Sequence, residues 1–241
     1  ELERVSASSV IHYHANIHKA LKYAVKLDLI SSNPADKIER PKKERFMANF
    51  YDADEVNRLF EISKGTKLEI PILFGAFYGM RRSETLGMKW DAIDFERDTI
   101  TIRHTLTTVA LDGKRITVAE DRTKNKSSMR TLPLVPFVKE RLLELKAEQE
   151  ENRRLCGRSY VKDYTGYVCI NEIGDIIKPN YVSCGFPKLL EEHGLRRVRY
   201  HDLRHSCASL LLANGVPMKQ IQEWLGHSDF STTANIYAHL E

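Results

Sequence analysis

The sequence predicts a mainly helical α+β fold that contains one small antiparallel β-sheet. Apolar residues recur at helical spacing through most of the 241 residues, whereas short runs rich in β-branched residues are concentrated between residues 99 and 133. Hydrophobic residues make up 42% of the chain and charged residues 29%, a balance that excludes the fibrous and disordered classes. A chain of this length can bury the core of one large domain or of two smaller ones.

The N-terminal segment predicts one helix followed by a linker. A helix over residues 6–30 is indicated by an apolar face made of Val10, Ile17, Leu21, Ala24 and Val25. Pro34 stops this helix, and residues 37–45 are polar, basic and interrupted by proline, as expected of a linker. Because one helix cannot form a domain alone, we expect residues 1–45 to be the C-terminal part of a helical domain plus a linker, and residues 46–241 to form a second domain.

The predicted second domain begins and ends with helices. Asp52 and Glu55, three residues apart, have the spacing of a capping box at the start of a helix. Further helices are predicted over residues 68–78, 81–88, 135–155, 179–193, 201–213 and 217–225, with a last one from about residue 231. The β-rich runs lie at residues 99–102, 115–118 and 130–133, and we expect them to pair in a single antiparallel sheet.

Several classes of protein are excluded before any motif is considered. The longest apolar run, residues 70–80, contains Pro71 and is too short to span a bilayer, and no secretion signal opens the chain. The four cysteines follow no metal-ligand spacing and are too few for a disulfide scaffold, which favours a reducing, intracellular location. A net charge of +4 permits an anionic partner without requiring one.

One candidate for chemistry is a basic segment at the start of a predicted helix. His201 and Arg204 are three residues apart and therefore share a face, and the amides of a helix N-terminus favour a phosphate there. A solvated helix start explains the same residues equally well. A metal pair made of His201 and His205 is a further alternative, but the zincin motif that it resembles has glutamate where this chain has Asp202.

Three more segments carry candidate residues, and each has an ordinary structural explanation when taken alone. Arg81, directly after a glycine break, has Glu84 three residues later, which is also the spacing of a common ion pair on a helix. Residues 122–130 form a basic turn before a strand, which is common at the tip of a hairpin. His227 follows a helix-ending glycine, and Tyr237 lies on a late helix, where such residues commonly cap or pack.

Taken together and in this order, the segments resemble the tyrosine recombinases, the phage integrase family that also includes Xer-type and transposon integrases. The family's Gly-x-Arg-x-x-Glu motif matches Gly79, Arg81 and Glu84, and its hairpin lysine matches Lys124. Its His-x-x-Arg motif matches His201 and Arg204. Its Leu-Gly-His motif matches Leu225, Gly226 and His227, and its nucleophilic tyrosine matches Tyr237. The resemblance covers about residues 52–239, and the first 45 residues resemble the end of the family's core-type DNA-binding domain.

The resemblance implies a catalytic set that consists of Arg81, Lys124, His201, Arg204, His227 and Tyr237. In this set the two arginines stabilise the charge of the phosphate, Tyr237 is the nucleophile, and Glu84 holds the Arg81 guanidinium in place. His201 is implied as the general base, Lys124 as the general acid and His227 as a further hydrogen-bond donor. No metal ion or other cofactor is implied.

The implied activity is site-specific recombination, in which DNA strands are cut and rejoined through a covalent 3′-phosphotyrosyl intermediate. The expected role is integration or excision of a phage or mobile genetic element. The expected partners are double-stranded DNA, three further copies of the chain in a homotetramer on two DNA sites, and accessory or excision factors, with no membrane. The expected location is the bacterial cytoplasm, in association with the nucleoid.

Basic residues outside the catalytic set are expected to contact DNA. They are Lys42, Lys43, Arg45, Arg82, Lys126, Arg130, Arg196 and Arg197. Two alternatives remain open: a type IB topoisomerase-like enzyme that relaxes DNA by the same chemistry, and a DNA-binding protein without catalysis. A covalent protein–DNA adduct would exclude the second of these, and resolution of a plasmid with two sites would exclude the first.

Overall fold

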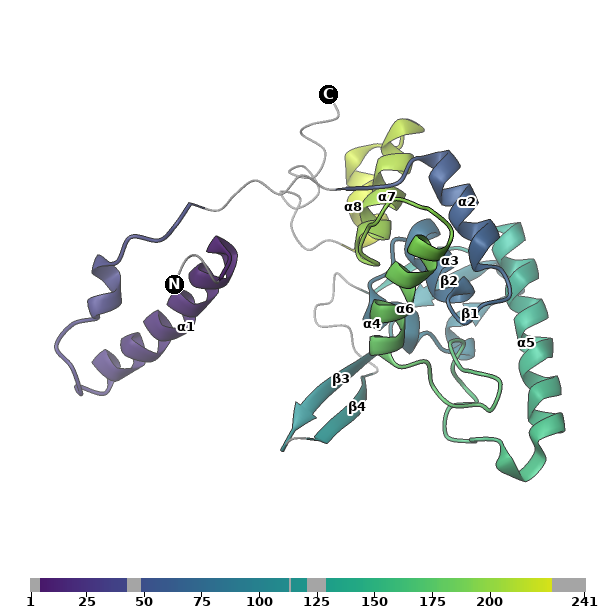
Figure 1. Ribbon diagram of the computed structural model, residues 1–241, viewed down its shortest axis with the longest axis horizontal. Helices are drawn as coiled ribbons and strands as arrows, with labels where there is room; N and C mark the ends of the chain where they lie inside the picture. The colour runs from purple at the N-terminus through teal and green to yellow at the C-terminus, as the bar shows by residue number, and fades with distance from the viewer. Residues whose placement is uncertain (1–4, 43–48, 113, 121–128, 227–241) are drawn as a thin grey trace. The chain divides into compact units, whose positions relative to one another are not determined.

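A computed structural model describes residues 5–42, 49–112, 114–120 and 129–226. The chain divides into two compact units, Glu1–Met47 and Ala48–Glu241. The fold class predicted from the sequence is confirmed, because the chain is mainly helical with small antiparallel sheets (Figure 1). None of the described helices is both long and apolar enough to cross a membrane.

The first unit contains the helix α1 (Ala7–Lys26) and the short 3₁₀ turn η1 (Pro34–Lys37). Ser6 caps α1 by accepting a hydrogen bond from the Ser9 amide, as a serine before a helix commonly does. The helix ends at Lys26, earlier than the predicted residue 30. Asp28 adopts a φ of 56°, and the Leu29 amide donates to the Ala24 carbonyl, so a Schellman turn closes the helix.

The second unit contains seven α-helices in its described part. They are α2 (Ala53–Ser63), α3 (Glu69–Phe77), α4 (Arg82–Gly87), α5 (Pro136–Cys156), α6 (Pro179–Glu192), α7 (Asp202–Ala213) and α8 (Met218–Leu225). The capping box predicted at the start of α2 is confirmed, because Asp52 and Glu55 exchange hydrogen bonds of 2.9 and 3.0 Å. The short turns η2 (Trp90–Ala92) and η4 (Gly157–Ser159) adjoin β1 and α5. The helix predicted from residue 231 lies outside the described residues.

The strands form two sheets where the sequence predicted one. β1 (Ile93–Asp94), β2 (Thr99–Ile102) and β5 (Arg130–Pro133) make a three-stranded antiparallel sheet in the order β1-β2-β5. β3 (Thr105–Leu111) and β4 (Lys114–Glu120) form a separate hairpin that projects from the unit (Figure 1). The strand predicted at residues 115–118 is therefore confirmed, but its expected place in the sheet with β2 and β5 is wrong.

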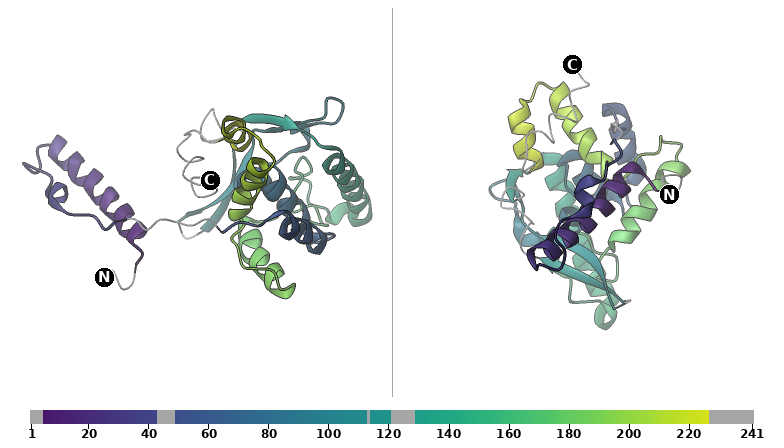
Figure 2. Two further views of the ribbon diagram at one scale, coloured as in Figure 1. Left: turned by 90° about the horizontal axis from the view of Figure 1, so that it is seen from above. Right: turned by 90° about the vertical axis from the view of Figure 1, so that its left-hand side faces the viewer.

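The core of the second unit surrounds α3, whose residues are almost all buried. This helix packs against α7 and α4, and α5 runs along one edge of the unit (Figures 1 and 2). Tyr200, just before α7, donates from its buried hydroxyl to the Pro71 carbonyl at 2.6 Å and approaches the Thr85 hydroxyl at 3.2 Å. These contacts fix the starts of α4 and α7 beside α3, and those two helix starts carry the candidate site.

Candidate active site

The turn between α3 and α4 positions Arg81. Gly79 in this turn has a φ of 60°, and a Cβ atom added to it would lie 2.3 Å from Leu225 Cδ2, so the position requires glycine. Arg81 precedes α4, and its amide donates to Glu84 Oε2 (3.0 Å) while its Nη1 donates to Glu84 Oε1 (2.6 Å). The Arg81 side chain is 35% exposed and the Glu84 side chain only 2%. The buried carboxylate therefore holds a guanidinium that solvent can reach.

Arg204 lies in the first turn of α7 and is 2% exposed. Its Nη1 donates to the Gly79 carbonyl and its Nη2 to the Leu225 carbonyl, both at 2.6 Å. Burial, together with the nearby Arg81 and Arg130 guanidinium groups, lowers the pKa of Arg204 to about 9. At neutral pH Arg204 is thus a cation whose charge has been taken largely out of water.

Arg130, on β5, is a third arginine in the same place. Its Nε donates to the Trp224 carbonyl (2.6 Å) and its Nη2 to Glu84 Oε2 (3.0 Å), and its side chain is 6% exposed. Both of these contacts point into the protein.

The carbonyls at the C-terminus of α8 accept hydrogen bonds from all three arginines. Gly226, with a φ of 67°, ends the helix, and the last carbonyls of a helix lack partners within it and form the negative end of its dipole. Three successive carbonyls accept hydrogen bonds here, from Arg130 to Trp224 (2.6 Å), from Arg204 to Leu225 (2.6 Å) and from Arg81 to Gly226 (3.4 Å). The site is therefore built where α4, α7, β5 and the end of α8 meet.

The charges of this cluster suit an anion. Burial raises the pKa of Glu84, but Arg130 and then Arg81 lower it more, so the net shift is downward and the carboxylate is ionised at neutral pH. Among the described residues of the cluster, three guanidinium groups face one carboxylate, so cations are in excess. Arginine matches the oxygens of a phosphate with two parallel donors, and of the three arginines Arg81 is the one most open to solvent.

His201 lies immediately before α7, next to this cluster in sequence. Its ring and that of His205 are 5.6 Å apart, centroid to centroid, and nearly perpendicular. Loss of solvation lowers the pKa of His201 to about 4, with further contributions from His205 and Arg204. At neutral pH this imidazole is uncharged and has a nitrogen able to accept a proton. Within the described ranges no third metal-ligating side chain joins the two histidines.

The other residues predicted to contact DNA are distributed more widely. Arg82 on α4 is exposed and contacts the Ser183 hydroxyl. Arg196 pairs with Glu55 (2.9 Å) and lies over the ring of Tyr51, so it also fastens the start of the second unit. Arg197 and Lys42 are exposed. Lys43, Arg45, Lys124, Lys126, His227 and Tyr237 lie outside the described residues.

Two features of the structure were missed at the level of sequence. The carbonyls at the end of α8 have no sequence signal beyond the glycine that stops the helix. On α1, Lys19, Lys22 and Lys26 are exposed and share one face, which their spacing of three and four residues could have revealed. This basic stripe gives the first unit a surface that favours a polyanion.

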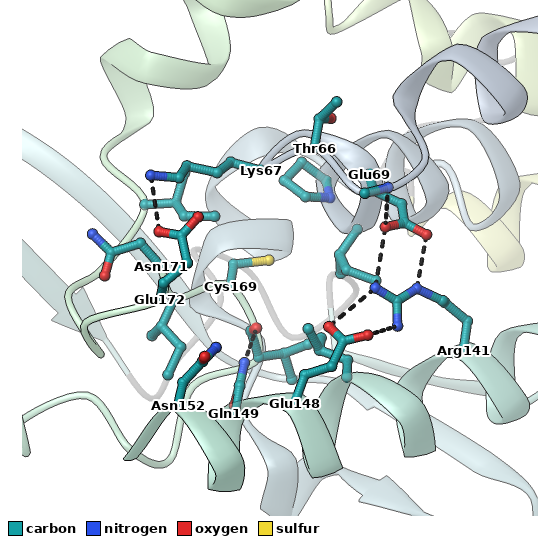
Figure 3. Close-up of a pocket in the computed structure, with 17 residues that line it drawn as sticks. Thr66, Lys67, Glu69, Arg141, Glu148, Gln149, Asn152, Cys169, Asn171 and Glu172 are labelled. Atoms are coloured by element: carbon teal, nitrogen blue, oxygen red, sulfur yellow. Dashed lines mark hydrogen bonds and ion pairs between the residues drawn. The ribbon is translucent and has the colours of Figure 1, made fainter. Parts of the chain in front are cut away.

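A separate polar pocket of about 220 Å³ lies between the start of α3 and α5 (Figure 3). Arg141 lies at one side of it, with bonds to Glu69 at 2.7 and 3.1 Å and to Glu148 at 2.9 Å. None of the arginines of the candidate site lines this pocket. Arg141 thus belongs to a separate ion-pair network, away from the site.

The chain is similar to known proteins over most of its length. Residues 49–241 match the phage integrase family. A tyrosine recombinase XerC-like protein of Caldanaerobacter subterraneus is 32% identical over 88% of this chain and 54% of its own length, and the tyrosine recombinase XerC of Pediococcus pentosaceus is 30% identical over 91% and 67%. The chain therefore spans about half the length of the first of these relatives.

Solved structures share the fold at lower identity. The Tn1549 transposon integrase, in complex with transposon right end DNA, matches 99% of this chain and 78% of its own with a TM-score of 0.76 and 19% identity. A lambda integrase dimer bound to a COC′ core site matches 98% of this chain and 75% of its own with a TM-score of 0.67 and 16% identity. These matches establish that the folds are alike.

Proposed function

The chain belongs to the phage integrase family, and on that premise we propose that it is a tyrosine-type site-specific DNA recombinase. The observation that carries the proposal is the cluster of Arg81, Arg204 and Glu84, in which a buried carboxylate and helix-end carbonyls hold arginines ready for a phosphate. The proposed reaction cuts and rejoins DNA strands without a metal ion or ATP.

The chemistry requires fixed cations. A phosphodiester is already negatively charged, and its pentacovalent transition state concentrates more charge on the non-bridging oxygens. Donors held in place before the reaction stabilise that charge without reorganising, and removing one such donor typically costs about 10²–10³-fold in rate. Arg81 is the guanidinium open to an incoming phosphate, and Arg204 lies behind the same turn.

The remaining roles follow from the family motifs. The Tyr237 oxygen would bond to phosphorus as the bond from phosphorus to the 5′ oxygen breaks, which leaves a 3′-phosphotyrosyl link and a 5′-hydroxyl. The phenol proton passes to His201, whose lowered pKa leaves it unprotonated, and the departing 5′ oxygen takes a proton from Lys124. His227 donates a further hydrogen bond to the phosphate. A 5′-hydroxyl from another duplex can then reverse the step and complete the exchange.

In the cell we propose that the protein integrates or excises a phage or mobile genetic element. The Tn1549 transposon integrase, with which this chain shares its fold, has been solved with circular intermediate DNA, which supports a mobile element. The proposed assembly is a homotetramer on two sites of double-stranded DNA, with accessory or excision factors. The proposed location is the bacterial cytoplasm, at the nucleoid.

Covalent capture tests the nucleophile. Because the target sequence is unknown, the probe is a pool of nicked duplexes with a randomised segment, in which cleavage near the nick releases a short strand and traps the adduct. We expect the wild-type chain to select a sequence and form an adduct that resists denaturation, and Tyr237→Phe to bind the same duplex without forming one. If Tyr237→Phe still forms the adduct, the nucleophile is another residue. If the wild type binds DNA but forms no adduct, the protein is a DNA-binding protein without this catalytic activity.

The phosphate clamp is tested by Arg81→Ala on the selected duplex. Arg81 is partly exposed and Glu84 keeps its bond to Arg130, so the variant should fold. We expect adduct formation to fall about 10²–10³-fold with little change in DNA binding. Arg141→Gln, which removes an arginine from the distant ion-pair network, is the matched control and should cleave like the wild type. Near-wild-type cleavage by Arg81→Ala would refute the assignment of the clamp.

A further inference from the structure

We propose that Arg130 is a positioning residue for strand cleavage, which holds Glu84 and the end of α8 in register so that Arg81 and Arg204 meet the phosphate. This inference rests on the recombinase function proposed above. It differs from the DNA contact that the basic sequence around Arg130 suggests, and it gives β5 a role in the chemistry although β5 carries no residue of the family's catalytic motifs.

The geometry of Arg130 joins the two parts that hold the other arginines. One end of its guanidinium donates to Glu84 Oε2, while Glu84 Oε1 accepts from Arg81. The other end donates to the Trp224 carbonyl, directly before the carbonyls that accept from Arg204 and Arg81. A single planar side chain therefore sets the distance between the carboxylate and the helix end.

Because this arrangement is buried, the Glu84 carboxylate needs its cationic partners. Glu84 is 2% exposed, and its ionised form depends first on Arg130 and then on Arg81 to offset the loss of solvation. Without Arg130, Arg81 would be the one cation left bonded to Glu84 among the described residues, and the Trp224 carbonyl would lose a charged donor. We expect Arg81 to be drawn toward Glu84 and away from the phosphate, because a buried carboxylate without sufficient partners is strongly disfavoured.

The same geometry argues against a direct contact with DNA. The Arg130 side chain is 6% exposed and makes two short bonds to protein groups. A phosphate could be bound only if those bonds were broken and the side chain came out of the interior. By comparison, Arg82 and Arg197 are exposed and can reach a DNA backbone directly.

The test measures single-turnover cleavage by Arg130→Gln on the selected suicide duplex, beside DNA binding and thermal unfolding. A second duplex carries a methylphosphonate at the scissile position, so that one non-bridging oxygen and its charge are absent. If Arg130 acts by aligning the cations, cleavage should fall about 10–100-fold on the phosphate and by much less on the uncharged phosphonate. DNA binding should stay within about threefold of the wild type, because phosphate contacts elsewhere on the protein dominate affinity.

A double variant keeps the test decisive if Arg130→Gln folds poorly. Glu84→Gln together with Arg130→Gln removes the buried carboxylate and its cation at once, which is better tolerated than losing one partner. In the Glu84→Gln background, adding Arg130→Gln should reduce cleavage far less than it does in the wild type. Equal losses in both backgrounds, or equal losses on phosphate and methylphosphonate, would overturn the proposal and indicate a general structural role.

Two controls separate this inference from the proposed function. Arg141→Gln should lower the unfolding temperature without changing the ratio of rates on the two duplexes, because the ion pairs of Arg141 join α5 to α3. If the wild type forms no adduct, the recombinase function itself fails. If the wild type forms an adduct and Arg130→Gln forms it at the same rate, the function stands and the positioning role of Arg130 is refuted.

Discussion

Glu84 shows how one buried carboxylate can control several cations. Its position between Arg130 and Arg81 makes its ionised form the stable one in the folded protein, in spite of burial. Since its pKa is lowered on folding, ionised Glu84 stabilises the protein at pH values above about 4.5, the usual pKa of a glutamate, and that contribution is lost as the pH falls below this value. Acid should therefore weaken the fold at the candidate site itself.

The ion pairs of Glu84 should make the stability of the fold depend on pH. We expect the free energy of unfolding of the wild type, measured by urea denaturation, to fall as the pH is lowered from about 5 to about 3. Glu84→Gln, which has no charge to lose, should be less stable at neutral pH and should show a shallower fall over the same range. Parallel curves for the two proteins would contradict the ion-pair account of Glu84.

His201 should titrate well below the usual range of a histidine. Loss of solvation and the neighbouring His205 and Arg204 disfavour its protonated form and lower its pKa to about 4. The His201 ring of the unfolded chain binds a proton near pH 6.5, whereas in the folded protein it does not until about pH 4. His201 therefore lowers the free energy of unfolding as the pH falls from about 6.5 toward 4. If His201 is the base, cleavage should stay constant from neutral pH down to about pH 5. An NMR titration of the His201 ring checks its pKa directly, and a midpoint near 6.5 would contradict the structure.

At the scale of elements, the turn between α3 and α4 depends on a close contact with α8. In Gly79→Ala the new methyl group would lie 2.3 Å from the Leu225 Cδ2 atom, so the Leu225 side chain or the end of α8 would have to shift. The carbonyls of both Gly79 and Leu225 accept from Arg204, so such a shift would disturb the candidate site. Gly65→Ala is the matched control, because Gly65 also has a positive φ, of 72°, but nothing lies within 4 Å of the added Cβ. We expect Gly79→Ala to lose about 1–3 kcal/mol more stability than Gly65→Ala by denaturant unfolding, and to cleave more slowly. Equal losses of stability in the two variants would mean that the end of α8 can shift away from the added methyl group at little cost.

The helices and strands also show which parts of the fold can be predicted from the sequence alone. The helix start at Asp52 and the strand at residues 99–102 were predictable because their signals are local, a capping pair and an alternation of threonine and isoleucine. The end of α1 was missed because Asp28, rather than a glycine, adopts the positive φ that closes it. β3 was missed because only its start packs into the core, through Leu106, whereas Val109 and Leu111 are exposed on a projecting hairpin and give no clear alternation of buried and exposed positions.

In the candidate site, too, contacts between residues close in sequence could be predicted, and contacts between distant residues could not. The bond between Arg81 and Glu84 was predictable from a spacing of three residues, and the structure contains it. The partners of Arg130 are 46 and 94 residues away in the sequence, and only the folded chain brings them together. A basic sequence around Arg130 therefore suggested a surface residue, although tertiary packing encloses its side chain.

At the scale of the whole molecule, the net charge of +4 conceals an uneven distribution. The glutamates of α5 are matched by as many lysines and arginines in the same helix, so α5 adds no net charge. Cations are concentrated in the arginine cluster of the second unit and in the lysines along α1 of the first. If both bind the phosphate backbone, each unit contributes its own share to the affinity for DNA, and the two shares can be measured separately.

Salt dependence measures the share of the first unit. Each phosphate that the protein neutralises releases a condensed counterion, so the logarithm of the affinity falls with the logarithm of salt concentration by about 0.9 per contact. The exposed lysines of α1, changed together to glutamine, should reduce that slope by about 2–3 while leaving the cleavage of bound DNA unchanged; they are Lys19, Lys22 and Lys26. A control variant carries glutamine at three exposed lysines scattered over the second unit, Lys64, Lys162 and Lys188, and should alter the slope less. Binding isotherms from low to physiological salt decide the matter, because an equal slope in the wild type and the α1 variant would remove this helix from the DNA-binding surface.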